Sequence, residues 1–261
     1  MALRFAALGS GSKGNCLVVE CGATRVLLDC GLAPRETARR LQRLGLAPTD
    51  IDAILLTHEH DDHAGQAYAF AGQHRIPVWL TYGTQVALSA AGKLPGEVQT
   101  RTLEGRDAFA LGALQIQPYT VPHDAREPVQ YVFSDGAVRL GVLTDIGTST
   151  AHVEATLSGL DALVLECNHD PDLLWGGGYP KWLKERITGP FGHLSNAQAE
   201  ALLGKLERSR LKHVIAAHLS QQNNTPALAQ EALARAMGCG AADIGLSTQE
   251  EGFAWRDLRP A

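Results

Sequence analysis

Three histidines and two aspartates occupy the six positions from His58 to His63, directly after an apolar run. Imidazole nitrogens and carboxylate oxygens together suit zinc, manganese or iron. In an extended segment, side chains two positions apart point the same way, so His58, His60 and Asp62 can converge, and His63 can serve a second ion. The spacing therefore predicts a site for two neighbouring metal ions. The alternative is a polar helix start with acids near its N-terminus, but capping rarely uses three histidines.

Three further candidate ligands stand where apolar segments end. His123 follows Tyr-Thr-Val-Pro, Asp145 follows Val-Leu-Thr, and His218 follows Val-Ile-Ala-Ala. Taken singly, each has an ordinary structural explanation: a hydrogen-bonded loop histidine, a turn aspartate and a core histidine, respectively. Because the same pattern occurs three times in one chain, we expect all three to lie in the predicted metal site.

Alternating groups of strands and helices must position these residues. Apolar runs and β-branched residues predict strands over 3–8, 16–20, 24–29, 51–57, 77–80, 113–121, 128–134, 137–145, 161–166 and 212–218, with a possible short strand pair at the end. Helical spacing predicts helices over 34–45, 64–74, 84–92, 149–159, 181–187, 195–207 and 225–237, and 175–180 reads as a loop. This order predicts an α+β fold, a four-layer αββα sandwich with two mixed sheets and outer helices, in one domain spanning 1–261.

Composition limits the classes of function. The chain has 261 residues and a formal net charge of −5, so no global basic field would hold it on nucleic acid or an anionic membrane. No apolar run is long enough for a transmembrane helix, and the first residues do not resemble a secretory signal. The five cysteines include no Cys-x-x-Cys pair and are expected to be reduced and mostly buried. We therefore expect a cytoplasmic protein.

The combined motifs resemble those of the metallo-β-lactamase-fold hydrolases, over nearly the whole chain. Residues 58–63 match the family's second motif, His123 the third, Asp145 the fourth and His218 the fifth. The resemblance implies one ion on His58, His60 and His123, a second on Asp62, His63 and His218, and Asp145 as the bridge. It implies two divalent ions as cofactors, zinc or manganese, with iron also possible.

Four other segments are similar to the WalJ/YycJ-type branch of this family, which is linked to DNA 5′–3′ exonuclease activity. These are LGSGSKGN at 8–15, ECNHD at 166–170, GHLSN at 192–196 and HLSQQNN at 218–224. The resemblance implies a nucleic-acid substrate, DNA in particular. The glycine turn lacks the Gly-Lys-Ser/Thr ending of a nucleotide-binding P-loop, but in this family context Ser12 or Asn15 could contact substrate. Lys181, Lys184 and Arg186 are expected first of all to form a solvated helix face. Of the basic groups in the chain, they are the better candidates for contacting a nucleic-acid backbone, because they precede His193.

A two-metal site would share a hydroxide that attacks phosphorus in line, and the ions would offset charge on the phosphate oxygens. Asp145 would set the ion separation, and Asp62 could also orient the hydroxide. The departing alkoxide needs a proton, and His193 is the candidate acid, with Glu166 as its orienting partner. Both are similar to a glutamate–histidine pair in tRNA 3′-processing nucleases. The alternative is that His193 packs or caps near the helix that begins at Ser195.

Three other functions compete with this hypothesis. The first is hydrolysis of a thioester or small ester, as in glyoxalase-type members of the fold; a thiolate leaving group needs no acid, so the pair of His193 and Glu166 favours a phosphodiester. The second is a di-iron redox protein, but that branch has glutamate where this chain has His60, and no flavin domain follows. The third is an inactive binding module, which the full ligand set argues against.

Overall fold

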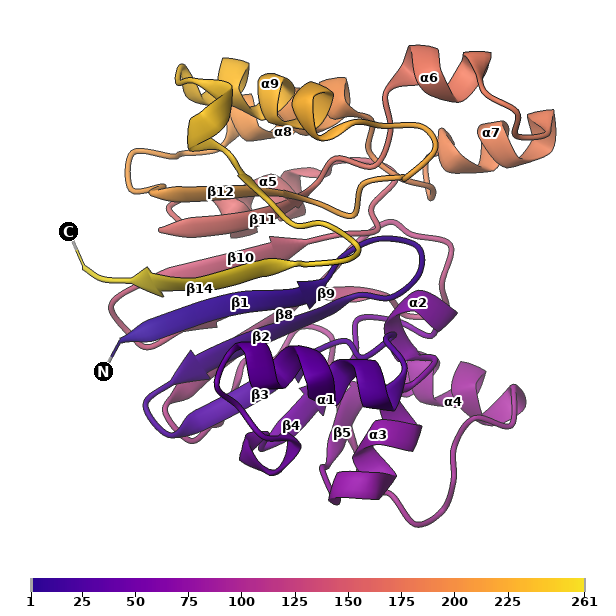
Figure 1. Cartoon of the computed structure of the whole chain (residues 1–261), viewed down its shortest axis with the longest axis vertical. Coiled ribbons are helices and arrows are strands. Elements are labelled where there is room, and N and C mark those ends of the chain that lie inside the picture. Colours follow the sequence, from indigo (N-terminus) through magenta and orange to yellow (C-terminus); the bar gives the residue numbers. More distant parts are fainter. Residues whose placement is uncertain (1, 261) are drawn as a thin grey trace.

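The strands of the computed structural model, which describes residues 2–260, form two seven-stranded sheets in that range (Figure 1). The first sheet has the order β14 (Phe253–Leu258), β1 (Leu3–Gly9), β2 (Cys16–Cys21), β3 (Thr24–Leu28), β4 (Ala53–Leu55), β5 (Val78–Thr81) and β6 (Thr100–Leu103). The second has the order β13 (Gly245–Leu246), β12 (His213–Ala217), β11 (Ala162–Glu166), β10 (Arg139–Leu143), β9 (Val129–Ser134), β8 (Leu114–Thr120) and β7 (Phe109–Leu111). Both sheets combine antiparallel and parallel pairs.

Helices cover the outer faces of the two sheets. They are α1 (Pro34–Arg43), α2 (Asp61–Ala64), α3 (Ala67–His74), α4 (Tyr82–Ala90), α5 (Ala151–Leu157), α6 (Pro171–Gly176), α7 (Lys181–Ile187), α8 (Asn196–Lys205) and α9 (Pro226–Met237), with 3₁₀ turns at Pro48–Asp50 and Ala241–Asp243. In Figure 1, α8 and α9 lie beside β12 at the top, whereas α1 and α3 lie over the strands at the bottom.

Three apolar clusters correspond to the three interfaces of a four-layer sandwich. One lies between the sheets and includes Phe5 and Tyr131, the second packs β10–β12 against α5, α8 and α9, and the third packs β1–β5 against α1 and α3. Strand β11 shows how the pattern arises: Val164 faces the opposite sheet, whereas Leu163 and Leu165 face the helices. Since neighbouring side chains in a strand point to opposite faces, a run that is apolar throughout must be covered on both sides. The predicted αββα sandwich is confirmed.

The structure also corrects some local predictions. Strands β6 and β7 and helix α6 were not expected, because each is a short element with little periodicity. The loop predicted over 175–180 is wrong at its start, since Trp175 and Gly176 complete the last turn of α6. Four cysteines are buried as expected, and Cys239 is exposed. None of the helices in residues 2–260 is both long enough and apolar enough to cross a membrane.

Candidate metal centre

The structure brings the seven predicted ligands to one end of both sheets, five of them in loops that follow strands and two in α2. Strands β10, β11 and β12 are mutually parallel, so Asp145, which follows β10, Glu166, which ends β11, and His218, which follows β12, meet at one edge. His58 and His60 follow β4 of the other sheet, and α2, which supplies Asp62 and His63, begins immediately afterwards. Figure 1 shows α2 at the right-hand end of the strands, where the two sheets meet.

These side chains form two adjoining clusters of potential metal ligands. His58, His60 and His123 make one, and Asp62, His63, Asp145 and His218 make the other, with one donor atom of each residue within 4.8 Å of the others in its cluster. A third group of the same kind, Asp145, Glu166, His193 and His218, overlaps the second. All seven predicted ligands are therefore brought together, divided as the family resemblance implied. The prediction that an extended segment would direct Asp62 to His58 and His60 is wrong, because Asp61–Ala64 form α2 and Asp62 lies with His63 in the second cluster. The donor set is suited to divalent cations.

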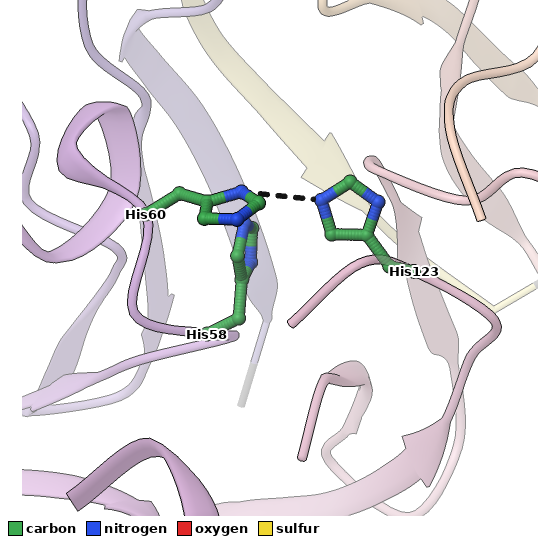
Figure 2. Close-up of side chains that lie close together, drawn as sticks. All are labelled: His58, His60 and His123. Atoms are coloured by element: carbon green, nitrogen blue, oxygen red, sulfur yellow. Dashed lines mark hydrogen bonds between the residues drawn. The ribbon is translucent and has the colours of Figure 1, made fainter. Parts of the chain in front are cut away.

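The first cluster is built entirely from imidazoles (Figure 2). His60 Nδ1 lies 3.3 Å from His123 Nε2, and the figure shows both rings turned toward the space above His58. The His58 ring lies 4.5 Å from that of His60 and 4.9 Å from that of His123, centroid to centroid. Nε2 of His58 is buried and has no hydrogen-bond partner among residues 2–260. A buried nitrogen without a partner is costly, and a bound cation would satisfy it.

The second cluster places two carboxylates against two imidazoles. His63 Nε2 lies 3.0 Å from Asp145 Oδ2 and 3.3 Å from Asp62 Oδ2. His218 Nε2 lies 3.4 Å from Asp62 Oδ2 and 3.5 Å from Asp145 Oδ1. Asp145 Oδ1 is also 4.0 Å from His123 Nε2, so Asp145 reaches both clusters. Its Oδ2 is buried and accepts no hydrogen bond within the described chain.

Four of the histidines each donate a hydrogen bond from Nδ1, the nitrogen that faces away from the clusters, to an acceptor of the protein. His58 Nδ1 donates to Thr57 Oγ1, whose own proton goes to Asp29, and His63 Nδ1 donates directly to Asp29. His123 Nδ1 donates to the Gly192 carbonyl at 3.2 Å, and His218 Nδ1 donates to Glu166 at 3.0 Å. Each ring therefore turns its Nε2 into the cluster. Such outer partners fix the orientation of histidine ligands in metal sites, so the residues present fit bound cations.

Asp29 is the functional residue that the sequence analysis missed. Its Oδ2 accepts the His63 Nδ1 proton at 2.8 Å, and its Oδ1 accepts from the Thr57 amide at 2.9 Å. Asp29 follows β3, which is parallel to β4, so it lies at the same edge as Thr57 and His58. The available signal was the one used for the ligands, a polar residue at the end of an apolar strand.

The backbone at the strand ends is itself unusual. Of the four non-glycine residues with positive φ in residues 2–260, three lie here: Asp29 at 61°, Asp145 at 53° and His218 at 55°. This left-handed conformation is uncommon for residues with a side chain, and the surrounding contacts must hold it in place. One such contact is the hydrogen bond from the His218 amide to Ser10 Oγ, at 2.8 Å. The strained turns direct the side chains into the clusters.

Glu166 links His193 to the second cluster. Its side chain is fully buried, and Oε1 accepts hydrogen bonds from His193 Nδ1 at 2.8 Å and from His218 Nδ1 at 3.0 Å. The amide groups of Asp145, Ile146 and Leu194 also donate to this carboxylate. His193 Nδ1 is 3.6 Å from Asp145 Oδ1, so the ring stands at the margin of the metal clusters. Ser195, not His193, caps α8.

The buried carboxylates of the site need positively charged neighbours to stay ionised. Burial raises the pKa of Glu166, but the imidazole of His193 and the hydrogen bonds from His193 and His218 outweigh it, leaving the pKa at about 2. Burial lowers the pKa of His218, but Asp145, Asp62 and Glu166 raise it to about 10. Burial also lowers the pKa of His58, which the neighbouring histidines lower further. The carboxylates thus stay ionised and require cationic neighbours, which protons or bound metal ions supply.

The sequence suggested substrate contacts from the glycine loop before β2 and from the basic residues of α7, and the structure leaves only some of these residues free to make them. Asn15 Nδ2 lies 3.2 Å from Asp62 Oδ2 and 3.0 Å from His63 Nε2, so Asn15 lies against the second cluster, whereas Ser12 is exposed at the rim. Lys184 is buried and donates to the carbonyls of Trp175 and Gly177, so it is unavailable to a substrate. Arg186 forms an ion pair with Asp124.

Comparison with known proteins agrees with this fold. A family model described as "Beta-lactamase superfamily domain" matches residues 24–218. The chain is 32% identical over 238 residues to "Exodeoxyribonuclease YycJ" of Bacillus anthracis, covering 91% of this chain and 90% of that protein. It is 31% identical over 250 residues to "Exodeoxyribonuclease WalJ" of Streptococcus pneumoniae serotype 2, covering 94% and 91%.

A solved structure shows the same fold at low sequence identity. The metallo-beta-lactamase fold protein YhfI from Bacillus subtilis superposes with a TM-score of 0.75 at 14% identity, covering 98% of this chain and 99% of that one. The family model spans most of the chain, and the two curated relatives align over nearly all of it. This chain therefore belongs to the beta-lactamase superfamily and is a metal-dependent hydrolase with the metallo-β-lactamase fold.

Proposed function

We propose that this protein is a dinuclear metal-dependent phosphodiesterase, specifically a 5′–3′ DNA exonuclease. The observation that carries the proposal is the hydrogen bond between His193 Nδ1 and Glu166 Oε1, 2.8 Å long, beside two ligand clusters. An alkoxide is a poor leaving group and needs a proton, whereas a thiolate does not. A held imidazole at the margin of a metal site therefore favours a phosphodiester over a thioester.

The two clusters would hold one divalent ion each. His58, His60 and His123 would hold the first, Asp62, His63 and His218 the second, and Asp145, which reaches both, would bridge them. Zinc and manganese suit this donor set, and iron is compatible with it. When bound, such ions act as Lewis acids toward phosphate and lower the pKa of water. Because both sheets supply ligands, residues 1–261 would act as one domain.

His193 would deliver the proton to the leaving oxygen. Its Nδ1 is committed to Glu166, so Nε2 is the nitrogen available to a substrate. Burial lowers the pKa of His193, but Glu166 and Asp145 raise it above its ordinary value, so the ring carries a proton near neutral pH. The Glu166 carboxylate would fix the ring orientation, and Asp62 would orient the attacking water. Placement of this kind typically contributes about 10²–10⁴-fold to rate.

The substrate class is supported by the relatives. The Bacillus anthracis and Streptococcus pneumoniae proteins are named exodeoxyribonucleases and align over at least 90% of their own lengths. Because the alignment covers most of both proteins, the DNA-degrading activity that their names give is our proposal for this chain. Digestion would proceed from the 5′ end.

The decisive experiment is digestion of single- and double-stranded DNA, labelled at either end, with manganese or zinc. We expect metal-dependent shortening from the 5′ end by the wild type and by His74→Ala, a histidine outside both clusters, but not by His60→Ala. RNA of the same sequence and a glutathione thioester are tested in parallel. Thioester cleavage without DNA cleavage by the metal-loaded protein would replace the nuclease proposal with a glyoxalase-type hydrolase.

A further inference from the structure

A groove of about 500 Å³ lies beside the loops that carry His123 and His193. Its walls include Arg106, Pro122, Thr150, His152 and Phe191. Two of these residues belong to the same loops as the site: Pro122 precedes the ligand candidate His123, and Phe191 lies two positions before His193. The groove therefore adjoins the loop that carries the proposed proton donor.

The wall that carries Phe191 is firmly held, although its ring is exposed. The Asp124 amide donates to the Phe191 carbonyl at 3.0 Å, and Thr148 Oγ1 donates to the Pro190 carbonyl at 3.1 Å. A Cβ added to Gly147 would lie 2.5 Å from the Phe191 nitrogen, so the glycine permits this close packing. Yet 56% of Phe191 is accessible to solvent. An exposed aromatic ring on a fixed backbone is a stacking surface for a planar group.

The charged side chains that line the groove also favour an anionic ligand. The guanidinium of Arg106 and the imidazole of His152 are exposed at it, and no acidic side chain lines it within the described chain. The whole chain carries a net charge of −5, so a groove lined by an arginine and no acidic residue differs from the rest of the surface. An aromatic ring with a nearby guanidinium suits a ligand that combines a base with a phosphate.

The proposed reaction determines which nucleotide of a polynucleotide would lie beside the groove. The proposed 5′–3′ exonuclease would release nucleoside 5′-monophosphates. In that hydrolysis the oxygen of water bonds to phosphorus and gives up one proton to solvent, the P–O3′ bond breaks, and O3′ leaves with the proton from His193. The leaving nucleotide must therefore lie on the His193 side of the phosphorus. We propose, building on the proposed function, that this groove binds that leaving nucleotide, with its base on Phe191 and its phosphate facing Arg106. The groove would then select a terminal nucleotide over a small ester.

The test separates this proposal from the proposed function by measuring binding as well as turnover. The probe is deoxyadenosine 5′-monophosphate, titrated calorimetrically into the metal-loaded protein, alongside steady-state kinetics on single-stranded DNA. Phe191→Ala is expected to weaken nucleotide binding at least about fivefold and to raise KM for DNA by a similar factor. Phe191→Tyr should restore both, and Arg106→Ala should weaken nucleotide binding without changing metal content.

Tyr82→Ala is the matched control, because Tyr82 is 67% exposed and lies outside the groove. Nucleotide binding that is equal in the wild type, Phe191→Ala and Tyr82→Ala would overturn the groove assignment, even if the wild type digests DNA. Nucleotide binding that depends on Phe191 in a protein that cleaves no DNA would support the groove and reject the nuclease. Restoration by tyrosine excludes a general folding defect as the cause of the loss.

Discussion

The imidazole of His193 and the carboxylate of Glu166 are joined by a 2.8 Å hydrogen bond, and the same carboxylate oxygen holds His218 at 3.0 Å. One buried oxygen thus orients both the proposed acid and a proposed metal ligand. Glu166 is the last residue of β11, which lies between the two parallel strands that Asp145 and His218 follow. In the proposed mechanism, proton delivery and metal binding would therefore be coupled through a single side chain, and substitutions around it should differ in which of the two they impair.

Replacing His193 with alanine should remove the acid and leave the metal ligands in place. We expect metal content equal to that of the wild type and turnover of a phosphodiester lower by about 10²–10⁴-fold. Metal analysis and initial rates on labelled DNA check both parts. Loss of metal would make His193 a ligand, as its place in the third cluster allows, and unchanged turnover would remove it from the mechanism.

Replacing Glu166 with glutamine should affect both functions at once. The amide keeps the size of the side chain but loses the negative charge that His193 and His218 face. We expect weaker metal binding, by about 10–100-fold, together with a loss of turnover that persists at saturating metal. Chelator competition and rates at several metal concentrations measure the two effects. A defect fully rescued by added metal would show that Glu166 acts only through His218.

Replacing Asp29 with asparagine should weaken metal binding without removing the acid. Asp29 accepts a hydrogen bond from His63 Nδ1 at 2.8 Å. In the described chain, Asp29 makes no hydrogen bond to Glu166 or His193, which bond to each other. Losing such an outer carboxylate typically lowers metal affinity about 10–100-fold. We expect near wild-type turnover once excess metal is supplied. Turnover that stays low with the metal bound would place Asp29 in the reaction itself.

Glu20 allows a pH test outside the metal centre. It lies between Arg4 and Arg25 on adjacent strands, at 2.5 Å and 2.6 Å. Burial raises the pKa of Glu20, but hydrogen bonds from the two arginines lower it below its ordinary value of 4.5. The folded state thus holds the proton less tightly than the unfolded chain does. The resulting stability is fully present above about pH 4.5 and is lost as the pH falls through the lowered pKa.

Glu20→Gln should accordingly reduce the free energy of unfolding at pH 7 by about 1–2 kcal/mol, between the values for exposed and buried ion pairs. The difference between wild type and variant should shrink below about pH 4.5, because the unfolded wild-type chain then takes up a proton at Glu20 that the folded state does not yet bind. Denaturant titrations at several pH values measure it. A difference that is constant from neutral to acid pH would mean that packing, rather than charge, sets the effect.

Several elements could be predicted from local sequence because their determinants are local. Period-two and helical patterns gave most strands and helices, and Pro34 and Gly45 marked the limits of α1 well. The segment from His58 to His63 concentrates enough donors to indicate a metal site by itself. His123, Asp145 and His218 followed from one rule, a polar residue at the end of an apolar strand.

Other features depend on contacts between distant positions and leave no local pattern. Asp29 stands at the end of an apolar strand as several ligands do, but its contact with His63 depends on the parallel pairing of β3 with β4, which the sequence does not reveal. The groove at Phe191 requires loops around residues 106, 122, 150 and 191 to meet, which no periodicity encodes. The sequence thus determined which donors exist and which strands carry them. Tertiary structure alone decided their partners, because strand order and loop packing set which side chains share one buried space.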